Sequence, residues 1–264
     1  MSGLLPTNIK SLVLDMDGVL WKEETPIGNL PAIFARIKAR GLKMAFATNN
    51  GLFTPDQYVE RLDRLGVKME SWQVITSALA VADLLARKYP SGGLIFAIGG
   101  AGVKVALRER GFELLSIQAA KKAQAVVMGL DLQINFEKMT EATLLVQHGI
   151  PLYATNPDKT FPTPRGEIPG AGAWVSVIVT ATGIEPIYAG KPSPYLIDLA
   201  RQRLGTAKNE TLVVGDRLET DIAGGQAAGY PVALVLSGVS QLAQAEIWKP
   251  DVNIIAQDLA QLVE

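Results

Sequence analysis

The sequence contains no cysteine and a single histidine, His148. The lack of cysteine excludes disulfide bonds, thiolate metal sites and cysteine nucleophiles. One histidine excludes every site that needs two, and its place before Gly149 at the expected end of a helix indicates a role at that terminus rather than in catalysis. A chemical site in this chain must therefore rest on carboxylates, hydroxyls, amides and amines.

The chain also lacks a long hydrophobic run and an excess of either charge. An apolar stretch of about 18 residues, the length of a membrane span, does not occur, and the N-terminal segment lacks the apolar centre of a signal peptide. The net charge is −1, and the longest basic run is Lys121-Lys122. We therefore expect a cytoplasmic protein that binds neither nucleic acid nor membrane.

What the chain does contain is an alternation of short apolar runs with helical periodicity. Of its 264 residues, 48% are hydrophobic, which is enough for a sizeable core. This alternation is typical of βα units around parallel sheets and predicts an α/β fold. We expect strands within 11–15, 42–50, 94–100, 123–130, 151–155, 211–215 and 231–238, and helices within 29–40, 54–66, 77–89, 101–111, 136–149, 173–183, 192–205 and 257–264. We expect a proline-rich loop over 156–173.

Polar side chains stand at the ends of three of these strands. Asp15 and Asp17 follow the first strand, Thr48 and Asn49 end the second, and Asp216 follows the strand "TLVVG". Ligands bind beyond the carboxyl ends of parallel strands, so these residues are candidates to meet at one site. Each acid could instead cap the helix that follows it.

If Asp15, Asp17 and Asp216 converge, their repulsion requires a cation. Oxygen ligands without histidine or cysteine favour Mg²⁺ over zinc. Asp221 could support the metal site through a bound water.

Other residues of the pattern suit a phosphate group. Thr48 offers a hydroxyl, and the backbone amides of Asn49 and Asn50 suit an anion. Lys191 would bring a positive charge, although alone it would be interpreted as a solvated surface lysine. The obvious nucleophile is then the Asp15 carboxylate, with Asp17, reoriented by Gly18, as general acid and base.

Four ordered motifs, "DMDGVL", "ATNN", "AGKPSP" and "VVGDRLETDI", resemble those of the haloacid dehalogenase superfamily. The long segment between the second and third motifs is similar to the α/β cap of subfamily IIA, which includes nitrophenyl-, phosphoglycolate- and pyridoxal-phosphate phosphatases. The resemblance implies a doubly wound parallel-sheet core over 1–78 and 187–264, with an inserted α/β cap domain over 79–186. It also implies a Mg²⁺-dependent phosphatase that hydrolyses small organic phosphate monoesters through an aspartyl-phosphate.

By this resemblance Asp15 is the nucleophile and Asp17 the general acid and base, while Thr48 and Lys191 complete the catalytic set. The phosphate would contact Asp17, Gly18, Thr48, Asn49, Asn50 and Lys191. The metal would be held by Asp15, the backbone carbonyl of Asp17 and Asp216, with Asp221 in support. The cap would contact the leaving group through Asn156, Asp158, Phe161 and Trp174, and a homodimer through the cap is the partner that the resemblance suggests.

Several alternatives stay open at this stage. Asn156 and Asp158 could serve only the turn around Pro157, and Trp21 could flank the mouth of the site or pack against the cap. Gly51-Leu52-Phe53 replace the polar and basic residues common in relatives. The same nucleophile would serve a phosphotransferase or mutase, and a non-catalytic phosphometabolite sensor is a third alternative.

Overall fold

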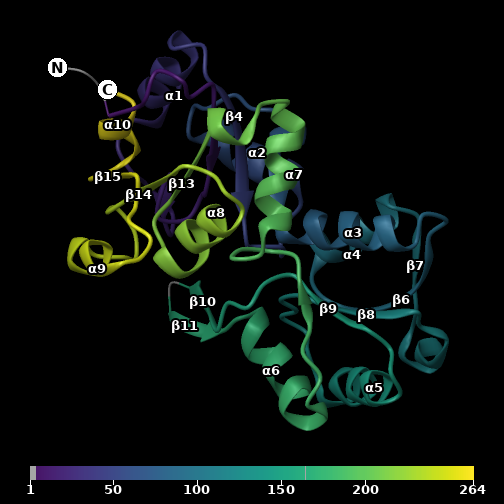
Figure 1. Ribbon diagram of the computed structural model, residues 1–264. Helices are drawn as coiled ribbons and strands as arrows, with labels where there is room; N and C mark the ends of the chain where they lie inside the picture. Colours follow the sequence, from purple (N-terminus) through teal and green to yellow (C-terminus); the bar gives the residue numbers. More distant parts are fainter. Residues whose placement is uncertain (1–3, 164) are drawn as a thin grey trace. The chain divides into compact units, whose positions relative to one another are not determined.

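The computed structural model describes residues 4–163 and 165–264, and these form two compact units (Figure 1). The first unit comprises the chain up to Thr48, Pro55–Ile75 and Lys191–Glu264, and the second comprises Asn49–Thr54 and Thr76–Gly190. The second unit is thus an insertion into the first. Besides the long insertion, it takes the short segment 49–54, which the sequence assigned to the other part of the chain.

The first unit is built on a six-stranded sheet with the order β15-β14-β13-β1-β4-β5. The pairings from β15 through β4 are all parallel. Its strands are β1 (Ser11–Leu14), β4 (Lys43–Thr48), β5 (Val74–Thr76), β13 (Thr211–Gly215), β14 (Val232–Val235) and β15 (Ile254–Ala256). Its helices are α1 (Leu30–Ala39), α2 (Pro55–Arg64), α7 (Pro194–Leu204), α8 (Ala223–Ala227), α9 (Leu242–Ile247) and α10 (Leu259–Leu262). The strands β2 (Trp21–Lys22) and β3 (Thr25–Pro26) form a small hairpin after β1.

Helix α1 shows how the sequence determines these elements. The Asn29 side chain accepts a hydrogen bond from the backbone N–H of Ala32 at 3.1 Å and caps the helix. Its apolar face, with Ile33 and Ile37, packs in one buried cluster with Leu12 and Leu14 of β1. The helix is followed by Gly41 in the left-handed conformation, with φ +68°. The hydrophobic periodicity, the N-cap residue and the glycine after the last turn therefore all predict the same position for this helix.

The second unit is built on a five-stranded parallel sheet with the order β12-β9-β8-β6-β7. Its strands are β6 (Gly93–Ile98), β7 (Phe112–Leu114), β8 (Ala125–Met128), β9 (Leu152–Ala154) and β12 (Ile187–Tyr188). Its helices are α3 (Ser77–Lys88), α4 (Ala101–Glu109), α5 (Phe136–Gln147) and α6 (Ala171–Thr182). His148 is the C-cap of α5, and its ring Nδ1 lies 2.6 Å from the Leu144 carbonyl oxygen, consistent with the predicted role at a helix end.

The segment predicted as a proline-rich loop over 156–173 contains regular structure. Strands β10 (Thr160–Thr163) and β11 (Gly166–Pro169) pair in antiparallel fashion, and helix α6 begins at Ala171. Prolines are tolerated there because each strand of a two-stranded ribbon has an outer edge without a neighbouring strand. A residue whose backbone nitrogen points to that edge does not need to donate a hydrogen bond. Pro164 lies outside the described residues. The helix predicted over 173–183 is confirmed as α6.

The topology of the first sheet brings distant residues together. Strand β1 lies between β13 and β4, and Leu14 pairs with Val214 on one side and Phe46 on the other. Asp15 continues the ladder by donating its backbone N–H to the Val214 carbonyl at 2.8 Å. The carboxyl ends of the three strands therefore meet at one edge, the place where parallel sheets carry ligand sites.

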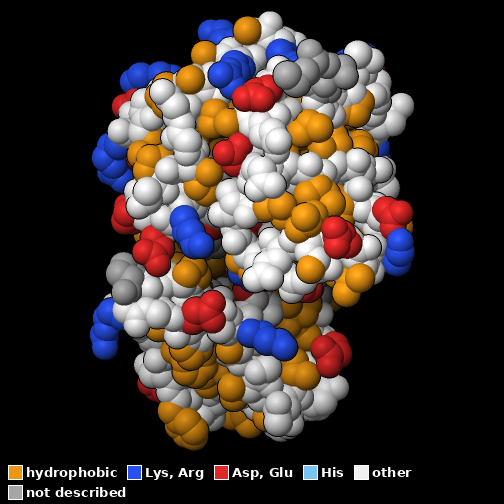
Figure 2. Space-filling model, turned by 90° about the vertical axis from the view of Figure 1, so that its left-hand side faces the viewer, with side chains coloured by type: hydrophobic (Ala, Val, Ile, Leu, Met, Phe, Trp, Pro, Cys, Tyr) orange, Lys and Arg blue, Asp and Glu red, His pale blue; other side chains and the backbone are white. Residues whose placement is uncertain are grey.

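Charged side chains of both signs are interspersed on the face drawn in Figure 2. Such mixing is expected for a chain with a net charge of −1. No helix within residues 4–163 and 165–264 combines the length and the apolar character needed to cross a bilayer.

Candidate active site

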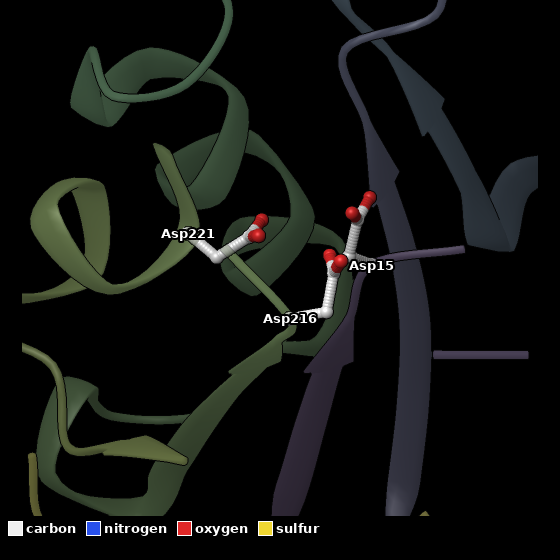
Figure 3. A group of neighbouring side chains, drawn as sticks. All are labelled: Asp15, Asp216 and Asp221. Atoms are coloured by element: carbon white, nitrogen blue, oxygen red, sulfur yellow. The ribbon is translucent and has the colours of Figure 1, made fainter. Parts of the chain in front are cut away.

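Three carboxylates converge at the end of the first sheet (Figure 3). Asp15 follows β1, Asp216 follows β13, and Asp221 lies in the π-helical turn Leu218–Ile222. Each offers an oxygen, and these oxygens lie within 4.8 Å of one another. Among the described residues this is the single group of three or more acids or histidines so placed. Of the three acids considered for convergence, Asp15 and Asp216 do meet, whereas the Asp17 carboxylate is not part of this group and Asp221, expected only in a supporting position, takes its place.

Burial makes this cluster electrostatically costly. Asp216 and Asp221 are 4% and 1% exposed. Burial, together with the charges of Asp221 and Asp216, raises the pKa of Asp15 well above its usual range, while Lys191 opposes the shift. Burial and the neighbouring Asp221 raise the pKa of Asp216 to about 6. Three carboxyl groups so close together, two of them buried, therefore favour either protons or a cation among them.

The donor set fits a small hard cation. Carboxylate oxygens without nitrogen or sulfur ligands match the preference of Mg²⁺ and Ca²⁺, and Mg²⁺ needs only one or two carboxylates beside water and phosphate oxygens.

Lys191 provides a positive charge inside the cluster. Its side chain is 3% exposed, and its Nζ lies 2.8 Å from Asp15 Oδ1 and 2.5 Å from Asp221 Oδ1. It also donates a hydrogen bond to the Ala47 carbonyl at 2.7 Å. Burial would lower the pKa of Lys191, but the two carboxylates raise it above its ordinary value. The structure thus contradicts the alternative of a solvated surface lysine and places a permanent cation beside Asp15.

Asp17 faces a different partner. Its Oδ1 accepts a hydrogen bond from the indole Nε1–H of Trp21 at 2.8 Å. Trp21 is fully buried in the apolar cluster of the first unit, and its indole N–H contacts the predicted acid and base. The backbone N–H of Gly18 donates to the Trp21 carbonyl at 2.7 Å and closes the loop.

Gly18 has a second function that sequence reasoning missed. Its φ is +78°, and a Cβ on it would lie 2.3 Å from Asp216 Oδ2. A Cβ on Gly238 would lie 1.9 Å from the same oxygen. The Asp216 carboxylate therefore lies between two glycines, whose missing side chains make room for it.

The segment 237–240, which follows β14, holds Asp216 from one side. The backbone N–H of Val239 donates to Asp216 Oδ2 at 2.8 Å, and the N–H of Ser240 donates to the Asp216 carbonyl at 3.0 Å. Ser237 Oγ donates to the Gly18 carbonyl at 2.7 Å. This loop carries no acid or base, so its sequence offered no sign of a role at the site.

Thr48 ends β4 and is 2% exposed. Its side chain is hydrogen-bonded to that of Tyr58, a residue of α2. Burial, and then the charge of Asp17, raise the pKa of Tyr58 well above its usual range. Tyr58 therefore keeps its proton beside the predicted phosphate-binding hydroxyl, and the sequence analysis did not single this residue out.

Asn49 and Asn50 belong to the second unit, and their side chains are engaged there. Asn49 Nδ2 lies 3.2 Å from both carboxylate oxygens of Asp158. Asn50 Oδ1 accepts a hydrogen bond from the Leu52 N–H at 3.1 Å. Gly51 packs tightly, because a Cβ there would lie 3.0 Å from Ser77 Oγ. The segment 49–54 is thus bound into the second unit by its own polar groups.

The residues predicted to line the substrate pocket of the second unit have structural partners. Asn156 Nδ2 donates to the Asn49 carbonyl at 2.7 Å, and its Oδ1 accepts from the Asp158 N–H at 3.0 Å, as in an Asx turn. Trp174 is partly buried against the apolar cluster of this unit, and Phe161 lies half-buried on β10. The turn around Pro157 therefore uses the polar groups of Asn156 and Asp158.

Comparison with known proteins supplies family relationships. Residues 12–113 match the haloacid dehalogenase-like hydrolases, and residues 188–262 match a related HAD-hydrolase-like family. The chain is 36% identical over 233 residues to an acid sugar phosphatase of Staphylococcus aureus. The aligned region covers 88% of each protein.

Solved structures of phosphatases are also similar to this chain. The p-nitrophenyl phosphatase of Archaeoglobus fulgidus is 33% identical with a TM-score of 0.89, covering 97% of this chain and 98% of that one. The glycerol phosphate phosphatase of Mycobacterium tuberculosis, crystallised with magnesium, is 32% identical with a TM-score of 0.90, covering 97% of this chain and 77% of that one.

Proposed function

The chain belongs to the haloacid dehalogenase superfamily of hydrolases, subfamily IIA, and we propose that it is a Mg²⁺-dependent phosphatase that works through an aspartyl-phosphate. Its fold is a doubly wound core with an inserted α/β cap domain, and its chemistry is the hydrolysis of phosphate monoesters. The observation that carries the proposal is the arrangement of Asp15. This carboxylate lies 2.8 Å from the buried Lys191 amine and within a cluster of two further acids.

The metal would be held by Asp15 and Asp216, with Asp221 and the backbone carbonyl of Asp17 beside them. When bound, Mg²⁺ would neutralise charge on the phosphoryl group and on these carboxylates. The relative crystallised with magnesium supports this choice of ion.

Asp15 attacks phosphorus in the first step, and the bond from phosphorus to the ester oxygen breaks. The electron pair of that bond stays on the leaving oxygen, which takes a proton from the Asp17 carboxyl group. Lys191 and Thr48 stabilise the phosphoryl oxygens through a positive charge and a hydroxyl. Water then attacks the aspartyl-phosphate, gives a proton to Asp17 and releases inorganic phosphate, which restores the Asp15 carboxylate.

Small organic phosphates are the proposed substrates. The relatives carry names that refer to sugar, nitrophenyl and glycerol phosphates, all of them small monoesters. By family resemblance, Phe161 and Trp174 of the cap domain are the apolar side chains proposed to contact the substrate.

A panel of phosphate monoesters tests the proposal. We expect turnover of p-nitrophenyl phosphate and of several sugar or polyol phosphates with Mg²⁺, and its loss with excess EDTA. Acid quenching during turnover followed by peptide mass spectrometry should find the mass of one phosphoryl group on the peptide that contains Asp15. A panel without turnover would refute the enzymatic proposal, and phosphate transfer to an added alcohol in preference to water would favour a phosphotransferase.

A further inference from the structure

The Asp17 carboxyl group has two oxygens, and the structure distinguishes them. Oδ1 accepts the hydrogen bond from Trp21 Nε1–H at 2.8 Å. Within residues 4–163 and 165–264, no group is hydrogen-bonded to Oδ2 of Asp17. The two oxygens of the proposed acid and base therefore differ before any substrate arrives.

Trp21 is held rigidly enough to impose this difference. Its side chain is fully buried, and Trp21 pairs with Pro26 in the β2–β3 hairpin. The guanidinium carbon of Arg61 lies 4.0 Å from the centre of the indole ring, and Arg61 also donates to the Glu23 carbonyl. The ring is thus enclosed by the core on one side and covered by a cation on the other.

The chemistry of indole then favours one oxygen of Asp17 over the other as the carrier of a proton. The indole nitrogen has a hydrogen to donate and no lone pair to accept with, so its partner must always be an acceptor. A buried indole N–H that lost this partner would be left without a hydrogen bond, which is unfavourable for a buried donor. The carbonyl oxygen of a protonated carboxyl group accepts hydrogen bonds better than its hydroxyl oxygen does, so the hydrogen bond from Trp21 favours Oδ1 as the acceptor and Oδ2 as the oxygen that carries the proton.

We infer that Trp21 is a positioning residue for acid catalysis: it reserves Oδ1 of Asp17 as an acceptor and directs the proton on Oδ2 to the leaving oxygen. This inference rests on the proposed role of Asp17 as general acid. In the first step Oδ2 gives its proton to the oxygen that leaves phosphorus, and the Asp17 carboxylate that results keeps the hydrogen bond from Trp21. In the second step Oδ2 takes the proton back from the attacking water.

The test uses substrates whose leaving groups differ in their need for a proton. A nitrophenolate leaves readily without protonation, whereas the alkoxide of glycerol phosphate does not. Trp21→Phe keeps an aromatic ring in the core and removes the N–H. We expect kcat/KM for glycerol phosphate to fall about tenfold, the size of one lost hydrogen bond of about 1.4 kcal/mol, and kcat/KM for p-nitrophenyl phosphate to fall less than about threefold.

The parameter kcat/KM is chosen because it reports the steps up to the first irreversible one, the transfer to Asp15. It is therefore insensitive to the later role of Asp17 as base. Equal losses on both substrates, or no loss on either, would overturn the inference.

Trp248→Phe is the matched control. Trp248 lies in the same unit and donates its indole N–H to Gln226 Oε1 at 3.0 Å rather than to an acid of the site. This variant loses the same kind of hydrogen bond and should keep the wild-type ratio of the two kcat/KM values. If Trp21→Phe folds poorly, site-specific 3-benzothienylalanine at position 21 replaces only the N–H by sulfur and should show the same selective loss.

Asp17→Asn distinguishes a failure of the proposed acid role of Asp17 from a failure of the positioning role of Trp21. If Asp17 is the general acid, this variant loses far more activity on glycerol phosphate than on p-nitrophenyl phosphate. Equal losses in Asp17→Asn would refute the proposed role of Asp17. A selective loss in Asp17→Asn with none in Trp21→Phe would refute the positioning role of Trp21 alone.

Discussion

Asp15 has the strongest set of opposing interactions in the site. Burial and two neighbouring acids disfavour its charge, and Lys191, at 2.8 Å, favours it. A carboxylate held this way is available as a nucleophile while its charge is balanced by a fixed amine. Lys191 also contacts Asp221, so one cation serves two acids.

Asp15→Asn tests the covalent route. The amide nearly preserves the shape of the side chain but cannot attack phosphorus, so kcat should fall at least about a thousandfold. The fold should persist, because one of three mutually repelling acids is removed. The measurements are steady-state turnover with Mg²⁺ and thermal unfolding of both proteins. Activity within a few-fold of wild type would contradict the aspartyl-phosphate mechanism.

At the scale of elements, the loop after β14 is the unexpected part of the site. Its backbone, rather than its side chains, holds the Asp216 carboxylate through Val239. Gly238 allows the loop to approach the Asp216 carboxylate closely, because a Cβ at this position would overlap with Asp216 Oδ2. The loop and the turn at Gly18 are joined by the Ser237 hydroxyl, so two distant segments position one metal ligand.

Gly238→Ala should displace the Asp216 carboxylate, because the added Cβ would overlap with its Oδ2. We expect Mg²⁺ affinity, measured by isothermal titration calorimetry without substrate, to fall about tenfold or more, equivalent to about 1.4 kcal/mol. Gly41→Ala is the control: a Cβ there meets nothing within 4 Å, although its φ of +68° makes the change mildly destabilising. Unchanged Mg²⁺ binding in Gly238→Ala would contradict the role given to this loop.

At the scale of the whole molecule, the acidic cluster links stability to pH and metal. The pKa of Asp216 rises from 3.8 to about 6 on folding. The folded state therefore binds this proton more tightly than the unfolded state does. For such a group, the contribution to stability is present at low pH and is lost as pH rises from about 4 through about 6.

We expect the metal-free protein to lose up to about 3 kcal/mol from this group over that interval, since one pKa unit corresponds to about 1.4 kcal/mol. Mg²⁺ should offset the loss by replacing the proton. The increase in unfolding temperature caused by Mg²⁺ should thus be larger at pH 7.5 than at pH 5, as measured by differential scanning calorimetry. In Asp216→Asn the difference between the two pH values should shrink, and an equal Mg²⁺ effect at both pH values in the wild type would contradict the linkage.

Much of the fold follows from local physics. The apolar periods predicted α1, α3, α4, α5 and the strands β1, β4, β8 and β13, because each period and its capping residues act within a few positions. The hairpin β10–β11 was missed, since its prolines are typical of loops and its pairing depends on which edges stay open. The short strands β5, β7 and β15 were also missed.

The sequence by itself determined the chemical types at the site: acids after β1 and β13, a hydroxyl at the end of β4, and a lysine, in a chain without cysteine and with a single histidine. Only the tertiary structure decided how these groups are held. The hydrogen bond from Trp21 to Asp17 and the close approach of Gly238 to Asp216 exist only in the folded chain. The physical reason is the distance along the chain over which each effect acts. Side-chain chemistry and hydrophobic periodicity can be recognised within a few neighbouring residues. The hydrogen bond or the missing Cβ that orients a carboxylate depends instead on contacts between residues that only folding brings together.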